Sequence, residues 1–262
     1  MKLRFVQISD HHLAEQDLLW GYSTWHALRS VVRHIAANAG PLDFIVSSGD
    51  LVEAGNDAEY RVFRDLIGAQ PAESYPGPLL AHGEGLAGVP FYVLPGNHDL
   101  RPALLRNLFP GSRSADRLHT WFEHGGVRFV CVDWGAENKA RSTPEMTTFL
   151  DQALGCEQPV VFLMHHHVAA IGHSRLDRLI ADDIDAFAAQ IAGRNILAIL
   201  AGHTHATYER SIVGIPVYGV RSTCFQFAEV EGELLRCLLP PHYRIVTIEN
   251  GTFSTELVEV PL

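Results

Sequence analysis

The stretch FVQISDHH, residues 5–12, joins a strand-like run to one aspartate and two histidines. Its apolar, partly β-branched half predicts a buried β-strand over residues 3–9, and the polar half lies where that strand ends. The same arrangement recurs where the runs FIVSS, FYVLP, VVFLM and ILAILA each precede a short polar motif. In open α/β sheets such strand ends meet at one edge, so we expect the five motifs to converge there.

The five motifs carry side chains that bind metal ions. They are Asp10-His11-His12, Gly49-Asp50, Gly96-Asn97-His98-Asp99, His165-His166-His167 and Gly202-His203-Thr204-His205. Carboxylates, an amide and imidazoles without cysteine form the mixed set of ligands that suits ions activating water near neutral pH. Any one motif alone is more simply a surface turn. Five in this order, each at a strand end, predict a centre with two adjacent metal ions.

Spacing within the motifs indicates which side chains share an ion. Asp10 and His12 are alternate residues of a segment that we expect to be extended, so both lie on one side and His11 on the other. His203 and His205 likewise lie on one side of a turn that we expect to be extended, and each could serve a different ion. Asp50 stands alone after its strand and is the natural bridging carboxylate between ions roughly 3.5–4 Å apart.

Strands and helices alternate along most of the chain. The pattern predicts strands over 43–48, 90–94, 127–133, 159–164 and 195–201, and helices over 24–38, 57–68, 144–154 and 181–192, with a short one after Pro102. After Gly202 short strands follow one another, and Asn250-Gly251 predicts a tight hairpin. We therefore expect an α/β fold, a four-layer α/β/β/α sandwich of two packed mixed β-sheets with outer helices. We expect one domain over 1–262, with a Gly- and Pro-rich insertion at about 69–89 and a β-rich C-terminal segment from about 206.

Composition excludes several classes of protein. The chain has 262 residues, 47% of them hydrophobic, enough for one large core. A formal charge of −10 argues against a broad basic surface for extended nucleic acid. No apolar run approaches the roughly 20 residues that span a membrane, and the N-terminus leads straight into a strand without a signal peptide. Four cysteines without CxxC spacing suit inert thiols in a reducing cytosol, so we expect a cytoplasmic protein.

The series DxH, GD, GNHD, H and GHxH resembles the calcineurin-like metallophosphoesterases over residues 3 to about 210. It is more similar to the bacterial class III cyclic-nucleotide phosphodiesterases and related glycerophosphodiesterases, through ISDHHL (8–13), LPGNHD (94–99), MHHH (164–167) and STCFQF (222–227). The resemblance implies one ion held by Asp10, His12, Asp50 and His205, and a second held by Asp50, Asn97, His165 and His203. Fe, Mn, Zn and Co all accept such ligands.

The resemblance also implies the roles of His98 and Asp99. His98 would contact the phosphoryl group and the leaving oxygen, with Asp99 orienting it, because a neighbouring carboxylate favours the protonated imidazole that donates a proton. Side chains expected to face the substrate are His12, Asn97, His98, His166 and His205. Related sequences carry proline shortly after the fourth-motif histidine, and this chain does not. His165 is assigned as the ligand because it directly follows its strand, which leaves His166 or His167 to face the substrate.

Charge balance points to a diester. Two divalent ions less two aspartates and a hydroxide leave roughly +1, which suits a singly charged phosphodiester. We expect a metal-bound hydroxide to hydrolyse a small phosphodiester, 3′,5′-cyclic AMP to 5′-AMP by family resemblance. Thr223, Cys224 and Phe225 follow the last motif and would line the site, with Phe225 either stacking on a base or lying in the core.

Several alternatives stay open. The diester could be a glycerophosphodiester, and the enzyme could be a broad-specificity phosphodiesterase or phosphomonoesterase, with Arg101 helping to bind a dianion unless it is a solvated helix-start residue. A nuclease would normally add a basic groove. A metal-binding scaffold without catalysis would have no use for His98 and Asp99. A homodimer that covers Phe225 and Phe227 is a further hypothesis.

Overall fold

The structure is a computed structural model that describes residues 2–231 and 233–261, and within these residues most strands belong to two six-stranded sheets. The first sheet has the order β16-β15-β1-β4-β6-β5. Its strands are β1 (Lys2–Ile8), β4 (Phe44–Ser47), β5 (Leu79–Ala81), β6 (Val89–Val93), β15 (His242–Glu249) and β16 (Thr252–Glu259). β1, β4 and β6 are parallel, whereas β5, β15 and β16 add antiparallel edges, so the sheet is mixed.

The second sheet has the order β11-β12-β10-β9-β8-β7. Its strands are β7 (Thr120–His124), β8 (Val127–Val132), β9 (Val160–Met164), β10 (Ile196–Ala201), β11 (Tyr208–Ile212) and β12 (Ile215–Gly219). β8, β9, β10 and β12 are parallel, and β7 and β11 are the antiparallel edges. All five strands that were expected to precede a motif are present, and each ends just before its polar residues.

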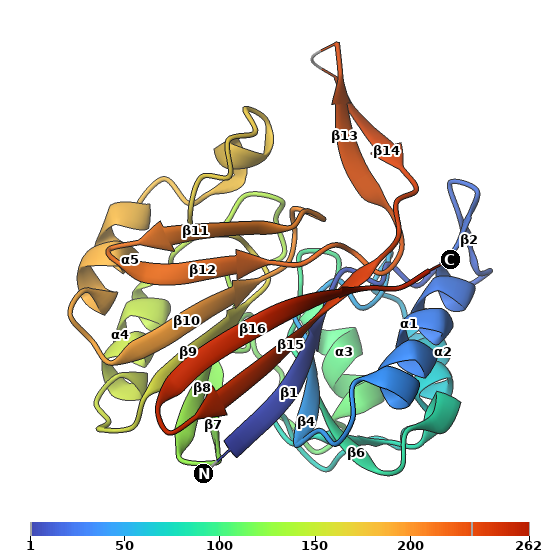
Figure 1. Ribbon diagram of the computed structural model, residues 1–262, viewed down its shortest axis with the longest axis horizontal. Coiled ribbons are helices and arrows are strands. Elements are labelled where there is room, and N and C mark those ends of the chain that lie inside the picture. Colours follow the sequence, from blue (N-terminus) through green and yellow to red (C-terminus); the bar gives the residue numbers. More distant parts are fainter. Residues whose placement is uncertain (1, 232, 262) are drawn as a thin grey trace.

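Helices cover the outer faces of the two sheets (Figure 1). α1 (Thr24–Asn38), α2 (Asp57–Ile67) and α3 (Arg101–Leu108) pack on the first sheet, and α4 (Pro144–Ala153) and α5 (Ile184–Ile191) pack on the second. The sheets meet face to face: in β9, Val161 and Leu163 point into the core between them, while Phe162 points toward the helices. The expected four-layer α/β/β/α sandwich is confirmed.

Local signals set most element boundaries. Ser23 caps α1, which spans the expected residues 24–38, and Asn56 with Glu59 forms a capping box at α2. Asn250 and Gly251 have φ values of 52° and 79° and form the two-residue turn between β15 and β16. The helix expected over 181–192 is shorter, because residues 181–183 form a turn and α5 begins at Ile184; a separate 3₁₀ helix, η2 (Leu176–Leu179), precedes that turn.

The Gly- and Pro-rich segment at 69–89 contains β5 and a 3₁₀ helix, η1 (Gly83–Gly85). A cavity of about 510 Å³ lies within it, lined only by residues between 70 and 82 and by none of the expected ligands. Cys131 and Cys224 are buried thiols, whereas Cys156 and Cys237 are partly exposed. Across the described parts of the chain, no helix has the length and apolar character needed to cross a membrane.

Two small hairpins lie outside the sheets. β2 (Leu18–Leu19) pairs with β3 (Tyr22–Ser23), and β13 (Gln226–Val230) pairs with β14 (Glu233–Cys237). The β13–β14 hairpin projects away from the two sheets, as Figure 1 shows. It begins directly after the segment 222–225, which lies beside the end of β1 through hydrogen bonds of Ser222 and Thr223 with Asp10 and Ser9.

Candidate metal centre

The five motifs converge where both sheets present the C-terminal ends of parallel strands. Asp10, Asp50 and Asn97 follow β1, β4 and β6 of the first sheet, and His165 and the Gly202–His205 turn follow β9 and β10 of the second. Among these residues, Asp10, Asp50 and His165 are buried, and each is at most 2% exposed. Because neighbouring strands deliver them, the donors come together inside the protein and away from bulk water.

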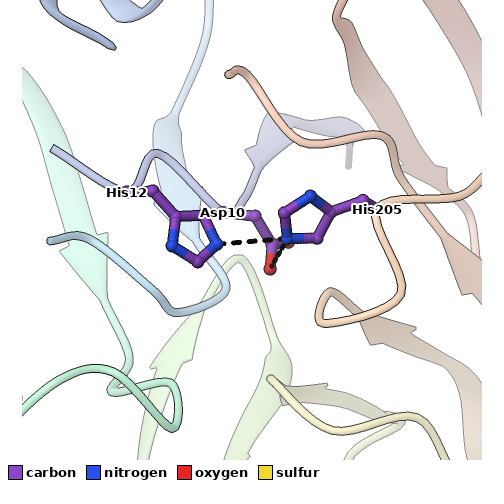
Figure 2. A group of neighbouring side chains, drawn as sticks. All are labelled: Asp10, His12 and His205. Carbon is purple, nitrogen blue, oxygen red and sulfur yellow. Dashed lines mark hydrogen bonds and ion pairs between the residues drawn. The ribbon is translucent and has the colours of Figure 1, made fainter. Parts of the chain in front are cut away.

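One donor group consists of Asp10 and His12 from the loop after β1 and His205 from the loop after β10, which point toward one another (Figure 2). His12 Nε2 lies 3.1 Å from His205 Nε2, and His205 Nε2 lies 3.4 Å from Asp10 Oδ1. A single ion between these atoms would replace unfavourable contacts between lone pairs with three bonds.

A second donor group consists of Asp50, His165 and His203, with Asn97 beside it. His165 Nε2 lies 3.0 Å from Asn97 Oδ1, 3.2 Å from His203 Nδ1 and 3.3 Å from Asp50 Oδ2. Asp50 Oδ2 also lies 3.5 Å from His12 Nε2 of the first group. The Asp50 carboxylate therefore lies between the two groups, in the position required of a bridging ligand.

Hydrogen bonds behind two of the expected ligands fix the orientation of their rings and the tautomer that each ring adopts when it is neutral. His165 Nδ1 donates to Ser48 O at 3.0 Å, and His205 Nδ1 donates to Phe225 O at 2.7 Å, because a carbonyl only accepts. In the neutral rings Nε2 then carries a lone pair that faces the other donors. Such outer bonds hold metal-ligating histidines in the required tautomer and orientation. The residues present fit two metal ions.

The charges at the centre agree with a site for cations. Burial raises the pKa values of Asp10 and Asp50, but His205 and His165 outweigh burial and hold both pKa values below the ordinary range. Burial likewise lowers the pKa of His165, but Asp50 and Asp10 outweigh that effect and raise it to about 9. The carboxylates thus stay ionised in a buried place and attract positive charge, which bound metal ions would supply.

The segments Asp10–His12 and His203–His205 were expected to be extended. That expectation is wrong, because their residues include left-handed backbone conformations. Positive φ angles occur at Asp10 (57°), His12 (46°), Asp50 (50°), His203 (68°) and His205 (51°). Such angles in non-glycine residues cost on the order of 1–3 kcal/mol each and persist where surrounding structure imposes them. Here Asp10 N donates to Gly49 O, and His11 N and His12 N both donate to Asp50 O, which locks the two motifs together.

Two glycines of the motifs are required by close contacts rather than by turns. A Cβ atom on Gly96 would lie 2.1 Å from Asp50 Oδ1, and one on Gly202 would lie 2.1 Å from Ser9 Oγ and 2.8 Å from Asp10 Oδ2. Any side chain at either position would displace an aspartate ligand. The spacing of glycine and ligand in the GNHD and GHxH motifs thus follows from packing around the carboxylates.

A family model described as calcineurin-like phosphoesterase matches residues 3–207. The chain belongs to this family. The chain is also 27% identical to the 3′,5′-cyclic adenosine monophosphate phosphodiesterase CpdA of Escherichia coli K12, over 98% of this chain and 89% of that protein. It is 24% identical to the 3′,5′-cyclic-nucleotide phosphodiesterase alr5338 of Nostoc, over 100% of this chain and 94% of that protein.

Solved structures share the fold of this calcineurin-like phosphoesterase. A dimetal phosphatase from Danio rerio aligns with a TM-score of 0.64 at 15% identity, over 99% of each chain. The purple acid phosphatase PPD1 of yellow lupin aligns with a TM-score of 0.65 at 15% identity, over 99% of this chain and 52% of its own. At this identity the likeness concerns the fold alone.

Glu53 is a site residue of this calcineurin-like phosphoesterase that the motifs did not reveal. Its Oε2 lies 2.7 Å from His12 Nδ1, and its backbone oxygen lies 2.7 Å from His98 Nδ1. Glu53 therefore orients a metal-facing histidine with its side chain and His98 with its backbone. The only signal in the sequence is an acidic residue three positions after Asp50.

Replacing Glu53 by alanine is expected to weaken metal binding about 10- to 100-fold, the usual effect of losing an outer partner of a metal-ligating histidine. Glu53→Gln keeps an acceptor for His12 Nδ1 and is expected to restore part of the affinity. Competition with a chelator measures the metal dissociation constants, with Glu15→Ala, an exposed glutamate, as the control. Unchanged affinity in Glu53→Ala would show that His12 needs no such support.

Asp99 does not orient His98, so that expectation is wrong. The Asp99 carboxylate accepts hydrogen bonds from Gly96 N at 2.8 Å, Tyr60 Oη at 3.0 Å and Leu51 N at 3.1 Å, and it is fully buried. These bonds tie the third motif to the second motif and to α2. Asp99 therefore positions the loop that carries Asn97 and His98, and it reaches His98 only through the backbone.

Arg101 is neither a solvated helix-start residue nor a side chain free to bind substrate. It is 4% exposed and forms a two-point ion pair with Asp133, through bonds from Nε at 3.0 Å and from Nη2 at 2.5 Å. Nη1 donates to Gly96 O and Asp99 O, both at 2.7 Å. Arg101 thus connects the third motif to the end of β8, and its guanidinium is paired with groups of the protein itself.

His166 does not face the substrate pocket, contrary to the expectation. It is 1% exposed, its Nε2 lies 2.8 Å from Glu137 O, and burial lowers its pKa to about 3. His167 is fully buried as well, and burial lowers its pKa to about 4. His11 lies between Ser47 Oγ at 2.8 Å and Thr223 Oγ1 at 3.0 Å. These three histidines are neutral parts of the packing around the ligands.

A pocket of about 360 Å³ opens at the metal centre, within the range of small-molecule sites. Its lining combines the centre and an aromatic and apolar wall: His12, Asp50, Glu53, Asn97, His98, Asn138, His203 and His205, with Trp20, Leu176, Leu179, Phe225, Phe227, Leu234 and Arg236. Phe225 is 2% exposed and packs on the rings of His12 and His205. Phe225 is a wall of the site and is too enclosed to stack on a base.

Proposed function

We propose that this metal-dependent phosphodiesterase hydrolyses 3′,5′-cyclic AMP to 5′-AMP. The observation that carries the proposal is one pocket with two kinds of wall: paired metal ligands on one side, and aromatic and apolar side chains on the other. The metal ligands suit the phosphodiester group, and the aromatic and apolar side chains suit a planar base. The relatives named above, which are cyclic-nucleotide phosphodiesterases, support this choice of substrate.

In this proposal the metal ligands bind the two positive ions, and His98 donates a proton to the leaving oxygen. Two bound ions supply positive charge to the phosphoryl oxygens and lower the pKa of water. His98 Nδ1 donates to Glu53 O, which leaves Nε2 of this partly exposed ring, with 31% of its side chain accessible, for the substrate. Hydrolysis adds water across the P–O3′ bond, and protonated His98 gives its Nε2 proton to the 3′-oxygen as that bond breaks.

A substrate series tests the proposal. We expect kcat/KM for 3′,5′-cyclic AMP to exceed the values for 2′,3′-cyclic AMP and glycerophosphoethanolamine at the same manganese loading. Bis(p-nitrophenyl) phosphate, whose leaving group needs little protonation, reports in parallel that the centre is active. Much slower turnover of 3′,5′-cyclic AMP than of the other two natural diesters would refute the cyclic-nucleotide assignment.

A small open diester is the second candidate. Asn97 Nδ2 donates to Asn138 Oδ1 at 3.0 Å at the edge of the pocket, and Glu53 also lines it. These amide and carboxylate groups give the pocket a polar side that would bind the hydroxyl groups of a glycerol moiety. Faster turnover of glycerophosphoethanolamine in the same series would favour this candidate.

A further inference from the structure

Trp20 lies in the pocket with a backbone conformation that is unfavourable for a tryptophan. It forms the turn of the β2–β3 hairpin together with Gly21, with φ values of 50° and 84°. Asparagine, aspartate and glycine are preferred at both positions of such a turn, and a bulky residue with positive φ is strained. Trp20 is nevertheless 49% exposed and lines the pocket of the metal centre. Strain and exposure of a large ring at a site indicate a ligand for that ring.

Arg236 of β14 places its guanidinium over the Trp20 ring. Arg236 Cζ lies 3.5 Å from the ring centroid of Trp20 and 5.5 Å from that of Phe225. Within 2–231 and 233–261, the Arg236 guanidinium makes no hydrogen bond or ion pair, and Arg236 is an exposed residue. The N–H donors of this planar guanidinium therefore remain available beside the Trp20 ring.

The pair lies one ring away from the metal ligands. Phe225 contacts His12 and His205 at centroid distances of 5.2 Å and 4.7 Å, and it contacts Trp20 edge to face at 5.3 Å. A phosphate at the ligands would thus have Trp20 and Arg236 on the far side of one aromatic ring. The ribose of a nucleotide separates its phosphate from its base by a comparable span.

The β13–β14 hairpin has other contacts that hold it in place. Arg175 Nη2 pairs with Glu233 Oε1 at 2.9 Å, and His173 Nε2 lies 3.3 Å from Glu229 Oε2. These pairs join both strands of the hairpin to the loop before η2. Arg236 is therefore not the only contact that keeps the hairpin at the pocket, and its free guanidinium is better explained by a ligand.

We propose that Trp20 and Arg236 form a platform on which the base of a nucleoside phosphodiester stacks. The platform would make the enzyme select nucleotides over aliphatic diesters, because a planar base gains from stacking on an aromatic ring or a guanidinium and an aliphatic group does not. The inference deepens the proposed function and rests on it, since it places the phosphodiester at the metal ligands. It gives Trp20 and Arg236 the stacking role that was considered for Phe225.

Equilibrium binding to the manganese-loaded protein tests the platform without any turnover. The probes are 5′-AMP and ribose 5-phosphate, which share a phosphate and a ribose and differ in the base. The wild-type protein is expected to prefer 5′-AMP, and Trp20→Leu is expected to lower that preference about 5- to 150-fold, the range for one base on an aromatic ring. Because both probes are measured on each variant, damage to the metal centre cancels in the ratio.

Trp121→Leu is the matched control. Trp121 of β7 is 37% exposed, lies outside the pocket and has its own arginine, Arg128, 5.5 Å over its ring. Its replacement is expected to leave the preference for 5′-AMP unchanged. Arg236→Lys keeps the charge and removes the planar group, so it is expected to lower the preference as well; full retention would show that Arg236 acts through charge alone and would overturn its place in the platform.

The outcomes separate this inference from the proposed function. A preference that depends on Trp20 in a protein that does not hydrolyse 3′,5′-cyclic AMP would sustain the platform and refute the substrate. Hydrolysis of 3′,5′-cyclic AMP with an equal preference in Trp20→Leu and wild type would refute the platform and sustain the substrate. The absence of any preference for 5′-AMP in the wild-type protein would also refute the platform.

Discussion

Replacing Asp50 by alanine is expected to lower the bound metal from two ions per chain to one or none and to abolish hydrolysis. Asp50 Oδ2 lies 3.3 Å from His165 Nε2 and 3.5 Å from His12 Nε2, so it is the carboxylate that serves both donor groups. Loss of an ion removes several kcal/mol of charge stabilisation, on the order of 10³-fold in kcat/KM. Elemental analysis and turnover of bis(p-nitrophenyl) phosphate measure the two effects.

Asp65→Ala is the control for this variant, because Asp65 is an exposed aspartate of α2. It is expected to keep both ions and full activity. The Asp50 variant also loses the hydrogen bond that His98 N donates to Asp50 Oδ1 at 2.9 Å. Activity can therefore fall because an ion is lost or because His98 is displaced, so the measured metal content decides whether Asp50 bridges the ions. Two tightly bound ions in Asp50→Ala would rule out the bridging role.

Replacing His98 by alanine is expected to keep both ions and to lower kcat roughly 10²- to 10⁴-fold, the range for a lost general acid. His98 lines the pocket and contacts the metal-facing ligand His12 only ring to ring, at a centroid distance of 4.8 Å. The loss should be largest for 3′,5′-cyclic AMP, whose 3′-oxygen needs a proton to leave. It should be smaller for bis(p-nitrophenyl) phosphate, whose leaving group does not.

His26→Ala is the matched control for His98, since His26 is an exposed histidine of α1 far from the pocket lining. Metal content in both variants shows that any loss arises in the chemistry. Equal losses on the two substrates would contradict proton donation and would assign His98 to positioning of the phosphoryl group.

The strands and the convergence of the motifs were predicted from local patterns, whereas the order of the strands within each sheet was not. A continuous apolar run predicts a strand that is buried on both faces. In β9, Val161 packs between the two sheets and Phe162 packs against the helices. A polar motif after each run then had to lie at the sheet edge. The structure brings together three overlapping donor groups, Asp10, His12 and His205, then Asp50, His165 and His203, and also His12, Asp50 and His98. The two ligand sets implied by family resemblance stay predictions. Confinement to one domain and the catalytic roles of the site residues stay predictions.

The errors arose where a neighbour in sequence was taken for a neighbour in space. Asp99 follows His98 in the chain, but its carboxylate turns back to Gly96 N and Leu51 N. His166 follows a ligand, yet its ring points to the Glu137 carbonyl. Side chains on consecutive residues of a turn diverge, and which of them reaches a site depends on packing from other parts of the chain.

The sequence by itself determined the donor atoms and the strands that carry them, because ligand chemistry and hydrophobic period are properties of single residues and short runs. Only the tertiary structure decided how those atoms face one another. Left-handed backbone at Asp10, His12 and Asp50 is strained in isolation and is held by hydrogen bonds between the loops after β1 and β4. Likewise, Trp20 meets Arg236 from the opposite end of the chain, a contact that no local pattern encodes.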